Sequence, residues 1–330
     1  MTIQYDLVQF SDKICDVYLS LLPEQQRDVA HGKLQWKFGN NPAGAGLIAT
    51  ATRNNEIIGI NAFMPSQFRI GSTSDIGYQS MDTIVTEAAR GQGVFGRLIQ
   101  SFYDHSDGAL LYGFPNLNSS PGFFGKLGWT YFGQVPMLIR PLRTGYFLKR
   151  ISGLLPDFPI PILSNSNISS ERVTRFDEDD TKTWRRFSTH LSCGLERDAE
   201  YLNWRLFDHP AEKYTALRAP DGSFIATSLV SKHGGKIGYL MEAVGQERTL
   251  QQLITAGLTS MKMSGADVAL AWCLPGSPNY RAYRKAGFYP FPSKLRPIAI
   301  NFGARPLHGD AAVVTVKSSW YLSYLDSDTV

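Results

Sequence analysis

The sequence is poor in the features that mark several classes of protein. Its 330 residues include only three cysteines, Cys15, Cys193 and Cys273, which are far apart and show no C-x-x-C spacing. An odd number of widely spaced cysteines argues against a disulfide framework and against a structural zinc site. We therefore expect free thiols, a reducing cytoplasmic setting and no bound metal.

The sequence also lacks long apolar runs and clusters of charge of one sign. No stretch of about 18 apolar residues occurs, and no basic segment near residue 1 leads into an apolar run. The 33 basic and 29 acidic residues are scattered along the chain, which argues against a nucleic-acid-binding surface. These absences predict a soluble protein with no membrane span and no nucleic-acid partner, and the length favours two domains.

The chain contains a diverged internal repeat. Trp36 precedes Pro42 by six positions, as Trp204 precedes Pro210, and a hairpin signal follows each pair: Asn54-Asn55 in the first case and Asp221-Gly222 in the second. Further on, the segment 123–129 resembles the segment 282–288. The second offset is about nine residues shorter than the first, so the second copy has lost residues between the two matches. We interpret Trp36 and Trp204 as core anchors.

The repeat predicts a division into three parts. Residues 1–145 form one domain, residues 146–170 form a linker rich in Pro, Ser and Asn, and residues 171–330 form a second domain.

A glycine-rich loop lies in the first copy where the second copy is shorter. The segment 81–85 is strand-like, Arg90-Gly91-Gln92-Gly93 follows, and Val94, Phe95, Leu98, Ile99 and Phe102 recur at helical spacing. A strand, a glycine turn and a helix N-terminus together direct backbone N–H groups at an anion. The pattern therefore predicts a phosphate-binding loop.

Two other phosphate loops fit this pattern less well. A Walker loop requires Lys and Ser/Thr after its last glycine, whereas Gly96 is followed by Arg97 and Leu98. A dinucleotide fingerprint matches Gly91, Gly93 and Gly96, but it belongs at the first strand of a βαβ unit, and here hairpin strands precede the loop.

The loop instead resembles the R-G-x-G-x-[GA] loop of the GCN5-related N-acetyltransferase (GNAT) superfamily, with Phe95 where Gly or Ala is usual. A second block supports the resemblance: Asn116, Asn118, Ser119 and Ser120 follow a strand-like run at 109–114, and Lys126-Leu127-Gly128-Trp129 ends the next segment. The second copy matches this block at Asn279, Tyr283, Lys285, Gly287 and Phe288 but has Val244-Gly245-Gln246-Glu247 in place of the loop. The resemblance implies an α/β chain of two GNAT-like domains in tandem, each a twisted mixed sheet flanked by helices, with only the first able to hold coenzyme A.

The resemblance also implies the co-substrate, acetyl-CoA or another short-chain acyl-CoA, and the residues that bind it. These are Ile84, Val85, Arg90, Gly91, Gln92, Gly93, Val94, Phe95, Gly96, Asn118, Phe123 and Lys126. In such chemistry an amine attacks the thioester directly, so an oxyanion donor and a base are needed. The backbone N–H of Val85, or of Ile84 or Thr86, is the candidate donor, and Asp82 is the candidate base or amine ligand, ahead of Glu87.

The general acid is left open. Phe124 stands where the family has its proton-donating tyrosine. Tyr283 occupies the matching place in the second copy and is kept as a catalytic candidate, although a core position suits it better. Tyr103, Tyr112, Ser120 or solvent are the alternatives. His209 and Glu242 are candidate substrate-binding residues of a cleft between the domains.

The resemblance is closest to two-domain bacterial proteins of surface-polysaccharide pathways, which include N-acyltransferases for nucleotide-linked amino sugars. We therefore expect a nucleotide-linked amino sugar as the acceptor. Two alternatives stay open: aminoacyl transfer of the peptidoglycan-branching type, and an acyl-CoA-binding module without turnover.

Overall fold

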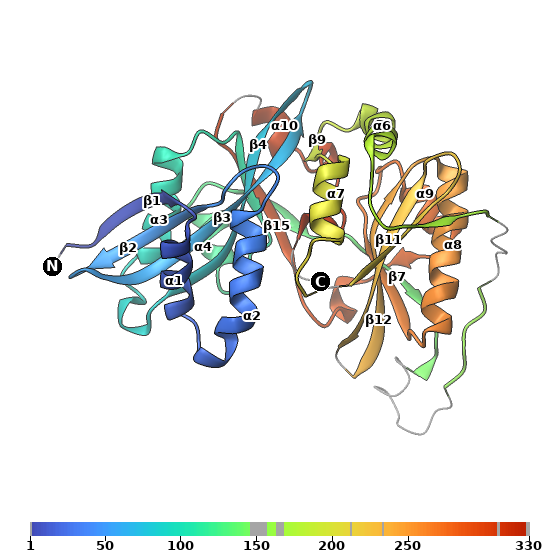
Figure 1. Cartoon of the computed structure of the whole chain (residues 1–330), viewed down its shortest axis with the longest axis horizontal. Helices are drawn as coiled ribbons and strands as arrows, with labels where there is room; N and C mark the ends of the chain where they lie inside the picture. Colours follow the sequence, from blue (N-terminus) through green and yellow to red (C-terminus); the bar gives the residue numbers. More distant parts are fainter. Residues whose placement is uncertain are drawn as a thin grey trace.

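The computed structural model describes residues 2–145, 157–162, 168–211, 213–232, 234–308 and 311–327. It shows two lobes side by side, each built around one mixed β-sheet with helices packed on it (Figure 1). The α/β class and the two mixed sheets expected from the sequence are confirmed. Most of the expected linker, residues 146–156 and 163–167, lies outside the described residues.

The first sheet is antiparallel except between β4 and β5, which are parallel. A short extra strand, β9 (Cys193–Leu195), pairs with the far end of β3. The sheet contains, in spatial order, β1 (Gln4–Gln9), β2 (Leu47–Arg53), β3 (Glu56–Ile70), β4 (Thr73–Val85), β5 (Leu110–Gly113), β15 (Asn301–Pro306) and β6 (Thr130–Gln134).

The second sheet repeats this plan, with β12 and β13 as its parallel pair. It contains, in spatial order, β14 (Tyr289–Pro290), β7 (Met137–Pro141), β13 (Val268–Trp272), β12 (Gly235–Val244), β11 (Phe224–Lys232), β10 (Tyr214–Arg218) and β8 (Glu171–Val173).

Two strands cross between the lobes. β7 belongs to the first segment of the chain but pairs with β13 and β14 in the second sheet, whereas β15 comes late in the chain and lies between β5 and β6 in the first. Sheet membership thus departs from a contiguous division at residue 145. Figure 1 shows β15 reaching into the first lobe and β7 standing in the second.

One long helix packs on each sheet, and shorter helices complete the lobes. α3 contacts β1 to β4, and α8 contacts β10 to β12. Of the apolar positions expected from helical spacing in α3, Val94, Leu98, Ile99 and Phe102 are buried and Phe95 is half-buried. The matching buried positions in α8 are Leu250, Leu253, Ile254, Leu258 and Met261. The helices are α1 (Asp12–Ser20), α2 (Glu24–Leu34), α3 (Val94–His105), α4 (Ser120–Gly125), α6 (Glu178–Phe187), α7 (Ala199–Leu206), α8 (Glu247–Met263), α9 (Tyr280–Lys285) and α10 (Ala311–Thr315).

Both hairpins expected from turn chemistry are present. Asn54 and Asn55 join β2 to β3 with φ angles of 51° and 65°, and Gly222 joins β10 to β11 with a φ of 83°. A tight hairpin turn requires such left-handed backbone, which Asn and Gly adopt at low cost.

The two repeat tryptophans meet where the lobes join. The rings of Trp36 and Trp204 stack with centroids 4.5 Å apart. Each indole N–H donates to the other residue's carbonyl, at 2.9 Å from Trp36 and 3.0 Å from Trp204. Both residues are buried, so the core-anchor interpretation is confirmed. This reciprocal pair shows that the two copies face each other about a local pseudo-twofold axis.

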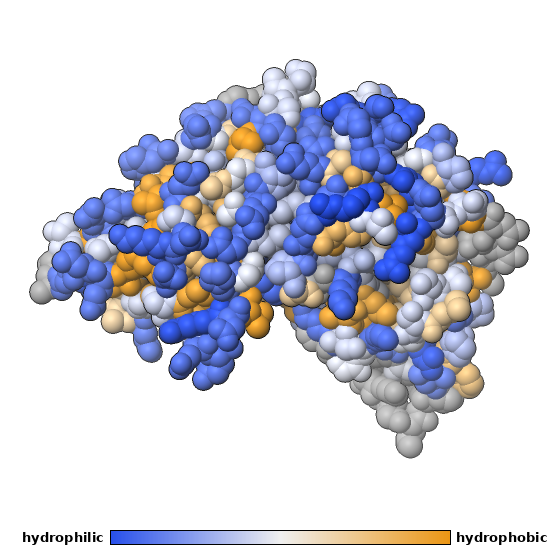
Figure 2. All heavy atoms as spheres, viewed as in Figure 1, coloured by the Kyte–Doolittle hydropathy of each residue, from blue (hydrophilic) through white to orange (hydrophobic). Residues whose placement is uncertain are grey.

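Polar and charged side chains cover most of the face shown in Figure 2, and apolar side chains form separate patches on it. Among the described residues, no helix is both long and apolar enough to cross a membrane.

Candidate active site

The central strands of the first sheet separate just before the glycine loop. β4 and β5 pair from Gly77 to Gln79, opposite Leu110 to Tyr112, after which β4 continues to Val85 paired with β3 only. The separation opens a pocket of about 570 Å³. Its lining residues come from β4, from the N-terminal turn of α3, from the segment after β5, from α4 and from Trp129: Ser80, Met81, Asp82, Thr83, Phe95, Gly113, Phe114, Pro115, Asn116, Asn118, Ser119, Gly122, Phe123 and Trp129.

The glycine loop leads from the end of β4 into α3. Gly91 and Gly93 have φ angles of 77° and 76°, and a Cβ at either position would meet no atom within 4 Å. No side chain caps the N-terminus of α3, and its first turn carries no acidic residue. The side chain of Gln92 bonds to Arg53 and to the Ala88 carbonyl. The space next to Gly91 and Gly93 and before the N-terminus of α3 is therefore free, which is the geometry of an anion site.

A β-bulge shapes the middle of the pocket. The register of β3 and β4 shifts between Ile60 and Ala62, and Asp82 on the bulged strand has a φ of 50°. Its carboxylate accepts from the Lys37 ammonium at 3.2 Å. The Asp82 side chain is about one third exposed (33%), and that of Lys37 is mostly buried. The bulge thus holds a carboxylate at the pocket wall, in a backbone conformation that a non-glycine residue adopts only with strain.

Two residues that the sequence did not single out support the bulge. Lys37 lies in a π-helical turn, Gln35–Gly39, a form of helix that is often found at functional sites. Asn61 on β3 is fully buried, donates to Ser80 Oγ at 3.2 Å and accepts from the Thr83 hydroxyl. Both act across the sheet from distant parts of the chain, so no local pattern could reveal them.

The amide of Val85 faces the open side of β4. The Thr86 N–H donates to Ile58 O on β3 at 2.9 Å. Successive N–H groups of a strand alternate between its two sides. The Val85 N–H therefore points away from β3, toward the gap that β5 leaves.

The other coenzyme-binding candidates divide into residues that line the pocket and residues that lie outside its lining. Phe95, Asn118 and Phe123 line it. Ile84 lies on β4, Val94 is buried beneath the loop, Gly96 lies in the first turn of α3, and Lys126 is exposed after α4. An Asx turn, in which Asn116 Oδ1 accepts from the N–H groups of Asn118 and Ser119, shapes the segment after β5.

The corresponding opening in the second sheet is filled. β12 and β13 stop pairing after Leu240 and Ala271. Asn279 occupies the gap: its Nδ2 donates to Ala243 O at 2.9 Å and to Tyr321 Oη at 3.0 Å, and its Oδ1 accepts from Cys273 Sγ at 3.2 Å. All of these side chains are buried.

The helix N-terminus of the second copy is blocked as well. The Gln246 N–H donates to Ser223 Oγ at 3.0 Å, and Glu247, in the first turn of α8, is ion-paired with Lys285 at 2.6 Å. A carboxylate at that position repels a phosphate. In the described part of the second copy, the N-terminus of α8 thus carries an acidic residue and an occupied N–H group, and the pocket beside Gly245 and Gln246 is smaller, at about 210 Å³.

Three sequence candidates lie away from the first pocket. Glu242 is completely buried, ion-paired with Arg197 at 2.9 Å and bonded to Tyr321 and Ser323, so its carboxylate is fully occupied inside the second lobe. Tyr283 is 1% exposed in the same core, and burial raises its pKa well above the ordinary value. His209 packs edge-on against Trp36, with ring centroids 4.2 Å apart, at the junction of the lobes. We therefore correct the assignment of Glu242 and Tyr283 to the site.

The alternative proton donors are also engaged elsewhere. The Tyr103 hydroxyl accepts from Trp129 Nε1 at 2.8 Å, and burial raises its pKa. Tyr112 is fully buried, with its hydroxyl 3.3 Å from Gln79 Oε1. The Ser120 hydroxyl donates to Asn116 O at 2.7 Å.

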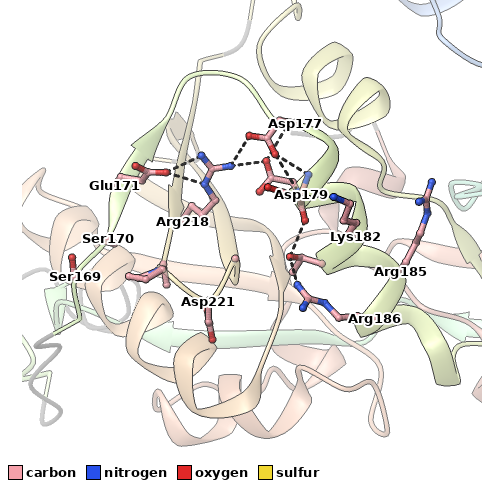
Figure 3. A pocket seen from close by; sticks show the side chains of 15 residues that line it. Ser169, Ser170, Glu171, Asp177, Asp179, Lys182, Arg185, Arg186, Arg218 and Asp221 are labelled. Carbon is pink, nitrogen blue, oxygen red and sulfur yellow. Dashed lines mark hydrogen bonds and ion pairs between the residues drawn. The ribbon is translucent and has the colours of Figure 1, made fainter.

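A larger cavity, of about 930 Å³, opens beside α6 and the β10–β11 turn (Figure 3). Its central cation, Arg218, is ion-paired with Glu171 (2.8 Å), Asp177 (3.3 Å) and Asp180 (2.8 Å). The Arg218 guanidinium is therefore fully engaged by three carboxylates. Among the described residues, no group of three or more His, Cys, Asp or Glu side chains is arranged to hold a metal ion.

No protein-family model and no curated protein sequence matches the chain. Solved structures do resemble it. A GCN5-related N-acetyltransferase from Kribbella flavida aligns over 94% of this chain and 74% of its own, with 14% identity and a TM-score of 0.60. A probable N-acyltransferase from Enterococcus faecalis V583 aligns over 96% and 75%, with 10% identity and a TM-score of 0.61.

A third similar structure carries a ligand. Saccharomyces cerevisiae N-myristoyltransferase with bound myristoyl-CoA aligns over 91% of this chain and 82% of its own, with 12% identity and a TM-score of 0.55. These alignments cover both lobes. The chain therefore has the two-lobed GNAT fold that these acyltransferases share.

Proposed function

We propose that this protein is an acyl-CoA-dependent N-acyltransferase that binds its coenzyme in the first lobe. One observation carries the proposal: the pocket between β4 and β5 adjoins the N-terminus of α3, which follows two left-handed glycines and has no acidic residue in its first turn. In the second lobe, Asn279 fills the corresponding gap between strands and Glu247 lies in the first turn of α8. An anion loop joined to a partly apolar slot suits a ligand with a pyrophosphate and a thioester arm.

In this proposal the coenzyme spans the pocket from loop to bulge. The pyrophosphate lies on the backbone N–H groups from Gly91 to Gly96, with Arg90 and Lys126 beside it. The pantetheine arm runs along Ile84 and Val85 between Phe95, Phe123 and Asn118, which puts the thioester at the bulge.

Two groups at the bulge would carry the chemistry. The Val85 N–H, which faces the gap, would stabilise the tetrahedral oxyanion; one such donor typically contributes about 2.7–4 kcal/mol to transition-state stabilisation. Asp82 would bind the acceptor amine or take its proton as the C–N bond forms and the C–S bond breaks, with Lys37 orienting the carboxylate. The departing thiolate takes its proton from solvent, because the hydroxyls of Tyr103 and Tyr112 are engaged in hydrogen bonds outside the lining of the pocket.

The acceptor we propose is a nucleotide-linked amino sugar, bound where the two lobes meet. Its support is the resemblance of the sequence motifs to acyltransferases of surface-polysaccharide pathways, together with the position of Lys37 and Asp82 near the lobe junction at Trp36. Aminoacyl transfer from tRNA is the second candidate, and it fits less well because the coenzyme loop is open.

A two-stage assay tests the proposal. Calorimetry should show one CoA per chain, and thiol release should be measured over a panel of acyl-CoAs against sugar nucleotides, free amino sugars and simple amines. Absence of CoA binding would refute the coenzyme assignment. CoA binding with turnover of simple amines but of no sugar nucleotide would refute only the acceptor.

A further inference from the structure

The base of the β4–β5 pocket is closed by Trp129 and Phe114, and aromatic side chains of the second lobe pack behind Phe114. The last pair of the two strands, Gln79 and Tyr112, is buried and joined by a hydrogen bond of 3.3 Å. Just beyond this pair, a Cβ at Gly113 would be 3.1 Å from Ser80 O and 3.4 Å from the ring of Trp129. The pocket therefore narrows to a dead end at Gly113, between β4 and the ring of Trp129.

Phe114 forms the wall on the opposite face of the sheet. Successive side chains of a strand point to opposite faces, so Phe114, which follows Gly113, points away from Trp129. Its ring stacks on Phe302 of the crossing strand β15, with centroids 5.5 Å apart and planes at 25°, and lies 5.2 Å from Trp272 of the second sheet. Phe114 lines the pocket and lies at the boundary between the two lobes.

The residues behind Phe114 are packed so that its ring cannot move away from the pocket. Trp272 is 1% exposed and stacks on Tyr324 with centroids 4.6 Å apart, and Phe302 is fully buried against Trp320 at 5.0 Å. A core packed to this density does not open a cavity without a cost in stability. The second lobe thus fixes one wall of the first lobe's pocket.

We infer that Phe114, supported by Trp272 and Phe302, limits the acyl chain of the donor to a few carbons. This inference rests on the proposed function, because in it the acyl group reaches beyond the bulge into the gap between β4 and β5, where Gly113 and Trp129 close one face and Phe114 closes the other. The second lobe then has a definite role in donor selection. Each methylene that does not fit an apolar pocket typically costs about 10–200-fold in specificity.

The test compares acyl-CoAs of increasing length, from acetyl to octanoyl, in kcat/KM and in binding affinity. The wild-type protein should prefer acetyl- or propionyl-CoA over octanoyl-CoA by at least about 10-fold. Phe114→Leu and Phe114→Ala should raise the ratio of long-chain to short-chain kcat/KM by at least about 10-fold, and Phe114→Trp should lower it. Affinity for CoA itself, which has no acyl group, should stay within about threefold of wild type in all three variants.

A matched substitution provides the control. Phe95→Leu changes the same type of side chain in the same pocket, but at the coenzyme end, where Phe95 lies 5.1 Å from Phe123. It should weaken CoA binding without moving the chain-length ratio. Equal use of octanoyl- and acetyl-CoA by the wild type, or an unchanged ratio in every Phe114 variant that still binds CoA, would overturn the inference while leaving the coenzyme assignment intact. If the wild type does not bind CoA, the coenzyme assignment and the inference on Phe114 are both refuted.

Discussion

The substitution Gly93→Glu tests the phosphate loop most directly. Gly93 has a φ of 76°, and a Cβ there would enter open space, so the new carboxylate projects to where the pyrophosphate is proposed to lie. Two unit charges about 4 Å apart at an effective dielectric constant of about 20 repel by about 4 kcal/mol. That energy corresponds to roughly a thousandfold loss of affinity. Calorimetric titration with CoA measures it.

Two further variants separate charge from backbone strain. Gly93→Ala carries only the cost of a left-handed L-residue, about 1–2 kcal/mol, and should reduce affinity at most about 30-fold. Gly234→Glu puts the same charge at an exposed residue on the turn between β11 and β12, where φ is 74° and a Cβ would also enter open space. It should leave CoA binding unchanged. If Gly93→Glu binds CoA within threefold of wild type, the loop assignment is wrong.

The corresponding position of the second lobe cannot serve as a control. A Cβ at Gly245 would lie 2.1 Å from Ser223 Oγ, and the φ of Gly245 is 136°. A side chain there would disturb the second lobe itself.

Three other outcomes follow from the structure. Asp82→Asn should lower kcat by about 10²–10⁴-fold, the usual contribution of a positioned acid or base, with the affinity for CoA unchanged; a kcat within threefold of wild type would contradict its role. Trp36→Ala should lower the free energy of unfolding by about 3–5 kcal/mol in denaturant titration. Trp36→Phe keeps a ring but leaves the Trp204 carbonyl without its donor, so it should lower that free energy by about 1–3 kcal/mol. A loss below 1 kcal/mol for the alanine variant would show that the stack is dispensable. Burial raises the pKa of the Cys193 and Cys273 thiols, so the folded state keeps protons that the unfolded state releases above about pH 8.5. Each thiol should therefore lower the free energy of unfolding by about 1.4 kcal/mol per pH unit above that value. Cys273→Ala should reduce this slope, and an equal slope in the variant would refute the argument.

Local chemistry made part of the fold predictable. The turn residues Asn54 and Asn55, the helical spacing in α3 and α8, and the repeat around Trp36 and Trp204 all carry their signal within a few residues. The glycine loop was predictable for the same reason, because its backbone geometry depends on the glycines themselves.

The rest of the site depends on contacts between distant segments. Lys37 and Asp82 are 45 positions apart and meet only through sheet and helix packing. Glu242 looked like a cleft residue because no sequence pattern shows that Arg197 lies 2.9 Å away in the same buried core. The crossing of β7 and β15 escaped notice because pairing between distant strands leaves no periodic trace in either strand.

The crossing strands also constrain how the protein is made. During synthesis at roughly 5–20 residues per second, β7 leaves the ribosome on the order of ten seconds before its partner β13. Through that interval the first sheet lacks β15 and β7 has no sheet to join, so both expose unpaired strand edges, which favour association with other chains. A gene fragment encoding either half would leave the same edges open permanently, and the two lobes are therefore expected to reach their native form together, late in translation, as one cooperative unit.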